Sequence, residues 1–228
     1  MFRLVFSALI ATSCATASTA PVAAAPAPHI EHEHEHEGAG HSGGGHDWDD
    51  TYREGKGFSL KPNALLASSI QGRKPGTALD IGMGQGRNAV YLATQGWSVT
   101  GVDTAAEGIR IAKENAAAAK ISLNAVVDDA DHFDMGKGQY DLVALMYVGG
   151  AEMTSRIDTA LKPGGLVVVE YFHKDMERQF GHQMGAFGSG ELESLYKGYK
   201  VIRSEVVEDT ADFGLRPAKL VRFVAQKP

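Results

Sequence analysis

From Pro62 to the end of the chain, apolar positions alternate between short continuous runs and positions spaced as on one face of a helix. The continuous runs predict strands over residues 77–81, 98–103, 123–127, 140–146 and 167–169. The helical spacings lie between them, in residues 62–70, 89–93, 104–119 and 153–161. Because strands that alternate with helices build parallel sheets, this pattern predicts an α/β domain.

The pattern changes after residue 169. A glycine-punctuated stretch and a short helix through Leu195 lead to two further strand-like runs, residues 200–207 and 220–225. Doubly wound sheets often carry antiparallel strands at one edge, so these two runs are expected to close the sheet.

A glycine-rich turn follows the first predicted strand, with Gly82, Gly84 and Gly86 in alternate positions. A dinucleotide fingerprint would require glycine or alanine at the position that Arg87 occupies. Asp80, at the end of the strand, would repel a diphosphate but would help to hold a cationic ligand. This favours S-adenosylmethionine, which carries an ammonium and a sulfonium, over a dinucleotide. The alternative for Asp80 is an acid that only caps the turn.

A second acid, Asp103, ends the next predicted strand, where a carboxylate can accept hydrogen bonds from both ribose hydroxyls. The alternative is an acid that only stabilises the start of the following helix. Thr104 and Glu107 have the spacing of a capping box, which predicts that this helix begins at Thr104.

Four ordered motifs resemble one known family, the class I S-adenosylmethionine-dependent methyltransferases. Among them the chain looks most like the small enzymes of the tellurite-resistance and thiopurine type. The motifs are residues 48–52 (WDDTY), 61–66 (KPNALL), 78–103 and 161–165 (LKPGG). The resemblance extends from Trp48 to about Pro228, and its one departure is Met83, where many relatives have cysteine or another small residue. It implies a doubly wound, mostly parallel, seven-stranded Rossmann-like sheet with an antiparallel C-terminal hairpin.

The cofactor-binding residues predicted in this way are Asp80, Gly82, Met83, Gly84, Gly86, Arg87, Asp103, Thr104, Asp129, Ala130 and Met146. The resemblance suggests that Asp129 accepts a hydrogen bond from the adenine amino group and that the Ala130 amide donates to the ring. Asp128 is the alternative for the first role, and Arg87 could instead be a surface cation.

Methyl transfer depends mainly on orientation of the nucleophile and exclusion of water, so a general base is optional. The catalytic candidates are Tyr147, His173 and Tyr52, although each could equally be a packing residue. After the fourth strand the chain reads Met-Tyr-Val-Gly-Gly (146–150), without the Asn/Asp-Pro-Pro-aromatic motif of methyltransferases that act on DNA or on protein glutamine. This favours a small-molecule acceptor, and no catalytic metal is expected.

The 228 residues carry a formal net charge of -6, and Lys and Arg form no cluster, which argues against a nucleic-acid surface. No apolar run reaches the roughly 18 residues that a membrane span requires. The length suits one domain, expected at residues 47–228.

Residues 1–20 have the features of a signal peptide: Arg3, the apolar run 4–11 and an Ala-Thr-Ala cleavage site at 15–17. This predicts a periplasmic or cell-envelope location. Cys14 leaves lipid anchoring open, although the large aliphatic residue usual three positions earlier is missing.

An Ala/Pro-rich and His/Glu/Gly-rich linker is expected at residues 21–46, and its histidines favour either a flexible tether or loose capture of a divalent metal. The main hypothesis is therefore an S-adenosylmethionine-dependent methyltransferase. The alternatives are an exported metal-binding protein on a non-catalytic scaffold and, less favoured, an NAD-dependent oxidoreductase.

Overall fold

The computed structural model describes residues 48–177 and 187–228. They belong to one compact unit, Gly45–Pro228. The expected signal peptide, Cys14 and the histidine-rich linker lie outside the described residues, so those expectations remain predictions.

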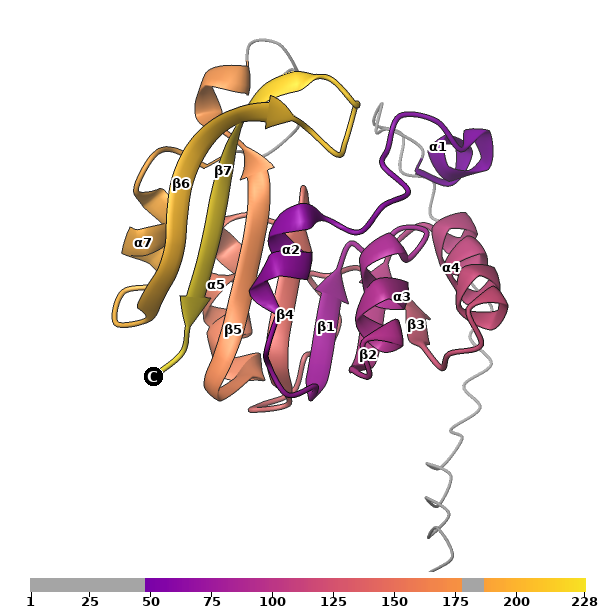
Figure 1. The fold of residues 1–228 in the computed structure, drawn as a ribbon, viewed down its shortest axis with the longest axis horizontal. Helices are drawn as coiled ribbons and strands as arrows, with labels where there is room; N and C mark the ends of the chain where they lie inside the picture. Colours follow the sequence, from indigo (N-terminus) through magenta and orange to yellow (C-terminus); the bar gives the residue numbers. More distant parts are fainter. Residues whose placement is uncertain (1–47, 178–186) are drawn as a thin grey trace, which may run out of the picture. The chain divides into compact units, whose positions relative to one another are not determined.

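A seven-stranded sheet, counted over the described residues, runs through this unit in the order β3-β2-β1-β4-β5-β7-β6 (Figure 1). Its strands are β1 (Thr77–Ile81), β2 (Ser98–Asp103), β3 (Asn124–Val127), β4 (Tyr140–Met146), β5 (Leu161–Phe172), β6 (Lys200–Thr210) and β7 (Pro217–Gln226). The first five are parallel, and β7 pairs antiparallel with both β5 and β6. This confirms the predicted doubly wound α/β sheet with its antiparallel C-terminal hairpin.

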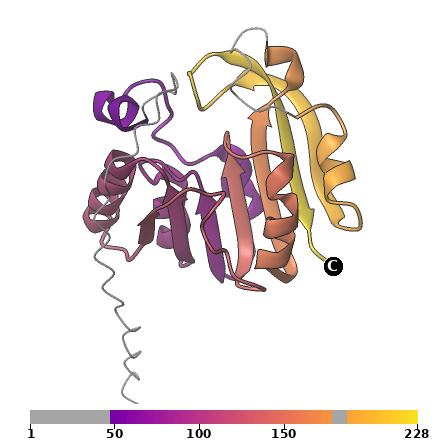
Figure 2. The ribbon, with the colours of Figure 1, turned by 180° about the vertical axis from the view of Figure 1, so that it is seen from behind.

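Helices cover both faces of the sheet. The helices are α1 (Trp48–Glu54), α2 (Ala64–Ser69), α3 (Arg87–Thr94), α4 (Ala106–Ala118), α5 (Thr154–Ala160) and α7 (Glu191–Leu195), with short 3-10 turns η1 (Ala151–Met153) and η2 (Lys174–Met176). Helix α1 lies against α4 beyond the strand ends and covers neither face (Figure 1). Apolar residues of α2, α3 and α4 pack in one core, and those of α5 and α7 pack in another (Figures 1 and 2).

Strand β4 is apolar from Leu142 to Met146, where it is buried on both faces. Leu142 and Ala144 belong to the core beneath α2 and α3, whereas Val143 and Leu145 belong to the core beneath α5. A parallel strand buried on both faces needs apolar side chains at every position. The central strands therefore hold their carboxyl ends in fixed register at one edge of the sheet.

Two local predictions are wrong. Helix α4 begins after Ala105, without a side-chain cap, and Thr104 makes no capping box. The backbone N–H of Glu107, which has no acceptor within its own helix, donates to Asp49 Oδ1 of α1 at 2.7 Å. An acid from a distant helix therefore takes the place of the local cap. The strand predicted at residues 167–169 is longer than expected. Strand β5 begins at Leu161, where the preceding helix was expected to end, and Leu161 already pairs with Tyr140 before a register shift.

Candidate functional site

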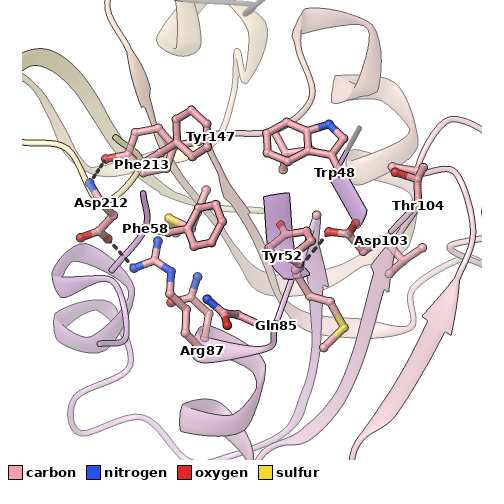
Figure 3. Close-up of a pocket in the computed structure, with 18 of the residues that line it drawn as sticks. Trp48, Tyr52, Phe58, Gln85, Arg87, Asp103, Thr104, Tyr147, Asp212 and Phe213 are labelled. Carbon is pink, nitrogen blue, oxygen red and sulfur yellow. Dashed lines mark hydrogen bonds and ion pairs between the residues drawn. The ribbon is translucent and has the colours of Figure 1, made fainter. Parts of the chain in front are cut away.

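A pocket of about 220 Å³ lies at the carboxyl ends of β1, β2 and β4 (Figure 3). Helix α1 and the loop between β6 and β7 also contribute to its wall. The lining residues are Trp48, Tyr52, Phe58, Ser59, Gly82, Met83, Gly84, Gln85, Arg87, Asn88, Val102, Asp103, Thr104, Asp128, Asp129, Ala130, Met146, Tyr147, Val148, Asp212 and Phe213. Open parallel sheets bind ligands at this edge.

The glycine loop is closely packed beneath the pocket. Gly84 has φ +52°, and a Cβ there would lie 2.3 Å from the Tyr52 hydroxyl oxygen. Gly82 has φ +64°, and its Cβ would lie 2.7 Å from Val148. Both positions therefore need glycine for backbone conformation and for space.

Asp103 organises the loop with its carboxylate. Its Oδ2 accepts from the Gly84 amide at 2.8 Å, and its Oδ1 accepts from the Ala105 amide at 2.9 Å. Burial raises the pKa of Asp103, although the two amides oppose that shift. The residue lies at the end of β2, as a carboxylate that binds ribose hydroxyls would.

Asp80 is buried beneath the pocket and does not line it; it is 1% exposed. Its Oδ2 is the only buried side-chain oxygen or nitrogen among the described residues that has no hydrogen-bond partner. Burial raises the pKa of Asp80 to about 7, with Arg87 opposing the shift. A buried carboxylate with one oxygen unpaired beside the loop suits a ligand that carries positive charge.

The pocket wall is also acidic. Four of the described lining residues are aspartates, namely Asp103, Asp128, Asp129 and Asp212, against the single cation Arg87. This charge balance disfavours a diphosphate and fits a sulfonium nucleoside. Glycine loop, ribose-side acid and local charge together fit S-adenosylmethionine. No group of three or more metal-ligating side chains occurs in residues 48–177 and 187–228.

The three catalytic candidates lie in different surroundings. Tyr52 covers Gly84, and burial raises the pKa of its phenol. Tyr147 lines the pocket, but its hydroxyl donates to Glu170 Oε1 at 2.7 Å and accepts from the Asp212 amide at 3.2 Å. Burial and the neighbouring Glu170 raise the pKa of Tyr147, which makes it a poor base.

His173 is not brought to the pocket. Its ring is buried, its Nδ1 accepts from the Asp175 amide at 3.1 Å, and its Nε2 lies 3.0 Å from Ser189 Oγ. These contacts give His173 a capping role at the start of η2. The sequence placed it near the pocket because it follows β5, but the chain turns away there.

Of the predicted cofactor residues, those that line the pocket are Gly82, Met83, Gly84, Arg87, Asp103, Thr104, Asp129, Ala130 and Met146. Asp80 and Gly86 lie behind this surface. Asp128 and Asp129 both reach the pocket, so the choice between them for the adenine amino group stays open. These roles remain predictions.

The sequence analysis singled out only Tyr52 from an aromatic cover over the pocket. The cover consists of Trp48, Tyr52, Phe58 and Phe213, with ring centroids 5.3 to 6.2 Å apart. Ser59 donates its amide to the Asp212 carbonyl at 2.8 Å, and Gly214 donates to the Gly57 carbonyl at 2.6 Å. The N-terminal segment and the β6–β7 loop are thereby joined across the pocket.

A buried polar network behind the cover was also missed. Glu170, 2% exposed, accepts from Asn63 Nδ2 at 2.6 Å and pairs with Arg222 Nε at 2.6 Å. Asp212 Oδ2 accepts from Asn63 Nδ2 at 2.8 Å and from Arg87 Nη1 at 2.7 Å. Contacts across such sequence distances leave no local signal; only Glu170, an acid in an apolar strand, stands out in the sequence.

Comparisons with known proteins agree with this geometry. A family model described as "Methyltransferase domain" matches residues 78–165. The ribosomal RNA small subunit methyltransferase C of Alcanivorax borkumensis is 31% identical over 46% of this chain and 36% of its own length. The ubiquinone biosynthesis O-methyltransferase of Pectobacterium atrosepticum is 26% identical over 71% of this chain and 64% of its own. The chain thus spans less than two thirds of either relative.

Among solved structures, TehB from Haemophilus influenzae has the same fold, with a TM-score of 0.61 at 18% identity. The similarity covers 73% of this chain and 62% of TehB. The matched domain, the sheet order and the glycine-loop pocket give one conclusion. The chain carries a methyltransferase domain at residues 78–165 and has the fold of S-adenosylmethionine-dependent methyltransferases.

Proposed function

We propose that this protein transfers a methyl group from S-adenosylmethionine to a small-molecule nucleophile. The observation that carries the proposal is the acidic pocket at the glycine loop, where Asp103 is fixed by the Gly84 and Ala105 amides. When bound, S-adenosylmethionine supplies an electrophilic methyl group on a positively charged sulfur.

The residues of this chain would divide the work of binding. Asp103 is placed to accept from ribose hydroxyls, and the loop around Gly84 provides space for close approach. Asp128, Asp129 and Ala130 lie where β3 ends and would contact the adenine. Asp80 adds negative charge beneath the loop when it is ionised.

Methyl transfer itself does not require a general base from these side chains. Both phenols that face the pocket have raised pKa values, and the Tyr147 hydroxyl is already engaged. The aromatic cover would exclude water while the pocket wall orients the nucleophile, and these two effects can account for the acceleration.

Calorimetry with S-adenosylmethionine, S-adenosylhomocysteine and NADH tests the cofactor. We expect saturable one-site binding of both nucleosides and no heat with NADH. A folded protein that binds neither nucleoside would overturn the proposal, and binding of NADH alone would favour an oxidoreductase.

The negative charge of the protein and of its pocket supports a small-molecule acceptor over nucleic acid. The net charge of -6 and the acidic pocket disfavour nucleic acid, although one relative is named for ribosomal RNA. Incubation with methyl-labelled cofactor and ribosomal RNA should leave the RNA unlabelled, whereas labelled RNA would contradict this part of the proposal.

We further propose export to the periplasm or cell envelope, supported by the apolar run 4–11 and the Ala-Thr-Ala site at 15–17. Cell fractionation and the mass of the mature N-terminus test it, and a mass gain lost in Cys14→Ser would indicate a lipid anchor instead of simple cleavage. No helix in the described part of the chain is long and apolar enough to cross a membrane.

The second candidate function is metal capture by the histidines of residues 29–46. Nickel titration of the full chain and of a chain lacking residues 29–46 separates the two functions. We expect the shortened chain to lose nickel binding and to keep S-adenosylhomocysteine binding. Loss of both would favour the metal-binding scaffold.

A further inference from the structure

The end of the pocket away from Asp103 holds a carboxylate, Asp212, in the loop between β6 and β7 (Figure 3). Its Oδ2 accepts two hydrogen bonds, from Arg87 Nη1 at 2.7 Å and from Asn63 Nδ2 at 2.8 Å. Its Oδ1 accepts no hydrogen bond from any described residue. The side chain is 23% exposed and lines the pocket, so one carboxylate oxygen remains available to a ligand.

The backbone of Asp212 is fixed by two other elements. Its amide donates to the Tyr147 hydroxyl at 3.2 Å, and its carbonyl accepts from the Ser59 amide at 2.8 Å. Arg87 is held in turn by the Lys61 carbonyl at 2.9 Å. A carboxylate anchored in this way is already oriented before a ligand binds, which lowers the entropic cost of recognition.

Aromatic rings flank this carboxylate. Phe58 and Phe213 have centroids 6.2 Å apart and planes inclined by 28°, and Tyr147 lines the same end of the pocket. Apolar rings with a few fixed polar groups are typical of small-molecule sites, and aromatic rings pack favourably against another ring, stacked or edge-on.

The charged residues that line the pocket restrict which methyl acceptors can bind there. Arg87 is the one basic residue among the described lining residues, and Asp212 already pairs with it. An anionic acceptor would therefore meet several aspartates and, among the described lining residues, no cation outside an ion pair. A protonated amine would be attracted, but it has no lone pair with which to accept a methyl group.

We propose that the methyl acceptor is a flat, uncharged ring bearing a hydroxyl group, and that this hydroxyl donates to Asp212 Oδ1. The inference rests on the proposed methyl transfer. The acceptor oxygen uses a lone pair to bond the methyl carbon, and the pair of the broken carbon–sulfur bond stays on sulfur. The hydroxyl proton passes to Asp212 and then to water, so atoms and charge balance.

Binding of two ring probes tests this assignment without relying on turnover. Catechol supplies uncharged hydroxyls, and benzoate supplies an anion on a ring of the same size. Each is titrated by calorimetry into full-length protein saturated with S-adenosylhomocysteine. The variant is Asp212→Asn, whose amide oxygen can still accept from Arg87 while its nitrogen replaces the free oxygen.

The matched control is Asp209→Asn. Asp209 lies in the same hairpin and gives one oxygen to Arg222 Nη2 at 2.7 Å, but it does not line the pocket. The controls for folding are the melting temperature and the affinity for S-adenosylhomocysteine of each protein.

We expect catechol to bind wild type and Asp209→Asn alike, and to bind Asp212→Asn about tenfold more weakly or worse, as for a lost hydrogen bond to a charged group. Benzoate should not bind wild type and should gain affinity in Asp212→Asn, a reversal that a purely structural role would not produce. Equal binding of benzoate and catechol to wild type, or an unchanged catechol affinity in Asp212→Asn, would overturn the inference. Absence of S-adenosylhomocysteine binding to folded wild type would instead refute the proposed function.

Discussion

The two ends of the pocket are built in different ways. The end around Asp103 uses backbone amides and carboxylates at the ends of neighbouring strands, and its residues follow one another between Gly82 and Ala130. The end around Asp212 uses rings and one ion pair, and its partners Arg87 and Asp212 are 125 residues apart. One end depends on a local loop conformation, and the other depends on the meeting of distant segments.

This difference has a consequence for mutation. A change in the local loop should affect cofactor affinity directly, whereas a change in the distant segments should affect the acceptor side and leave the loop intact. The effects of mutations at the two ends on binding free energy are expected to add only if no residue couples the two ends. Affinity for S-adenosylhomocysteine is therefore the common scale on which the variants below are ordered.

The largest expected effect belongs to Asp103→Ala. The change removes the acceptor for the Gly84 and Ala105 amides together with the expected ribose contacts. Each hydrogen bond to a charged group contributes about 1.5–3 kcal/mol, so we expect the affinity for S-adenosylhomocysteine to fall roughly 100-fold or more. Calorimetry with S-adenosylhomocysteine measures it. Asp131→Ala, an exposed acid in the same region, should change nothing; equal losses in both variants would remove Asp103 from the site.

Gly84→Ala should come next. At φ +52° an L side chain is strained, and its Cβ would displace the Tyr52 hydroxyl from 2.3 Å. Gly138→Ala is the matched control, because Gly138 has φ +57° and open space around its Cβ. Both variants should lose about 1 kcal/mol of stability, which urea unfolding measures. Only Gly84→Ala should lose cofactor affinity, by about tenfold, since Tyr52 must move. Normal affinity in Gly84→Ala would show that Tyr52 yields without cost.

A third prediction concerns Asp80 and pH. Burial raises its pKa from 3.8 to about 7, so the folded protein binds the proton more tightly than the unfolded chain does. The contribution of this group to the free energy of unfolding therefore falls as pH rises from about 4 to 7, by at most about 4 kcal/mol. Asp80→Asn should remove this dependence and be more stable than wild type at pH 8, with a smaller difference at pH 5.

The same ionisation should act on binding. Wild-type affinity for the cationic S-adenosylmethionine should increase several-fold from pH 6 to 8, and that of Asp80→Asn should stay flat. Urea unfolding and calorimetry at both ends of the range measure the two effects. Asp134→Asn, an exposed carboxylate, provides the control. A parallel pH profile in wild type and Asp80→Asn would contradict the assignment.

The sequence predicted the Asp103 end of the pocket well for a physical reason. Strand limits at β1, β2 and β4 follow from continuous apolar runs, and the loop chemistry follows from glycines and acids adjacent in the chain. The limits of β1, β2 and β4 could therefore be predicted to the residue, whereas β5, β6 and β7 are longer than predicted. The capping box at Thr104 failed because Asp49, from another helix, satisfies the Glu107 amide.

The Asp212 end could not be predicted in this way. Phe58 and Phe213 become neighbours only when the N-terminal segment meets the last hairpin, and neither has a local pattern that marks it. Asp212 looks like an ordinary loop acid until Asn63 and Arg87 are placed beside it. His173 shows the converse case: a favourable position along the chain, after a sheet strand, does not ensure that a side chain reaches the pocket.

The smallest effect on the cofactor is expected for Phe213→Ala, the variant that tests the separation of the two ends most closely. The ring contacts Trp48, Phe58 and Phe172, so its removal should loosen the aromatic cover. The bonds from Ser59 to Asp212 and from Gly214 to Gly57 should open more often, which amide hydrogen exchange detects as faster exchange at Ser59 and Gly214. Leu215→Ala, in the same loop with an exposed side chain, is the control. Affinity for S-adenosylhomocysteine should change by no more than about threefold, since the Asp103 contacts are untouched. A loss as large as that of Gly84→Ala would mean that the cover and the glycine loop act as one unit through Tyr52, and the division of the pocket into two independent ends would have to be abandoned.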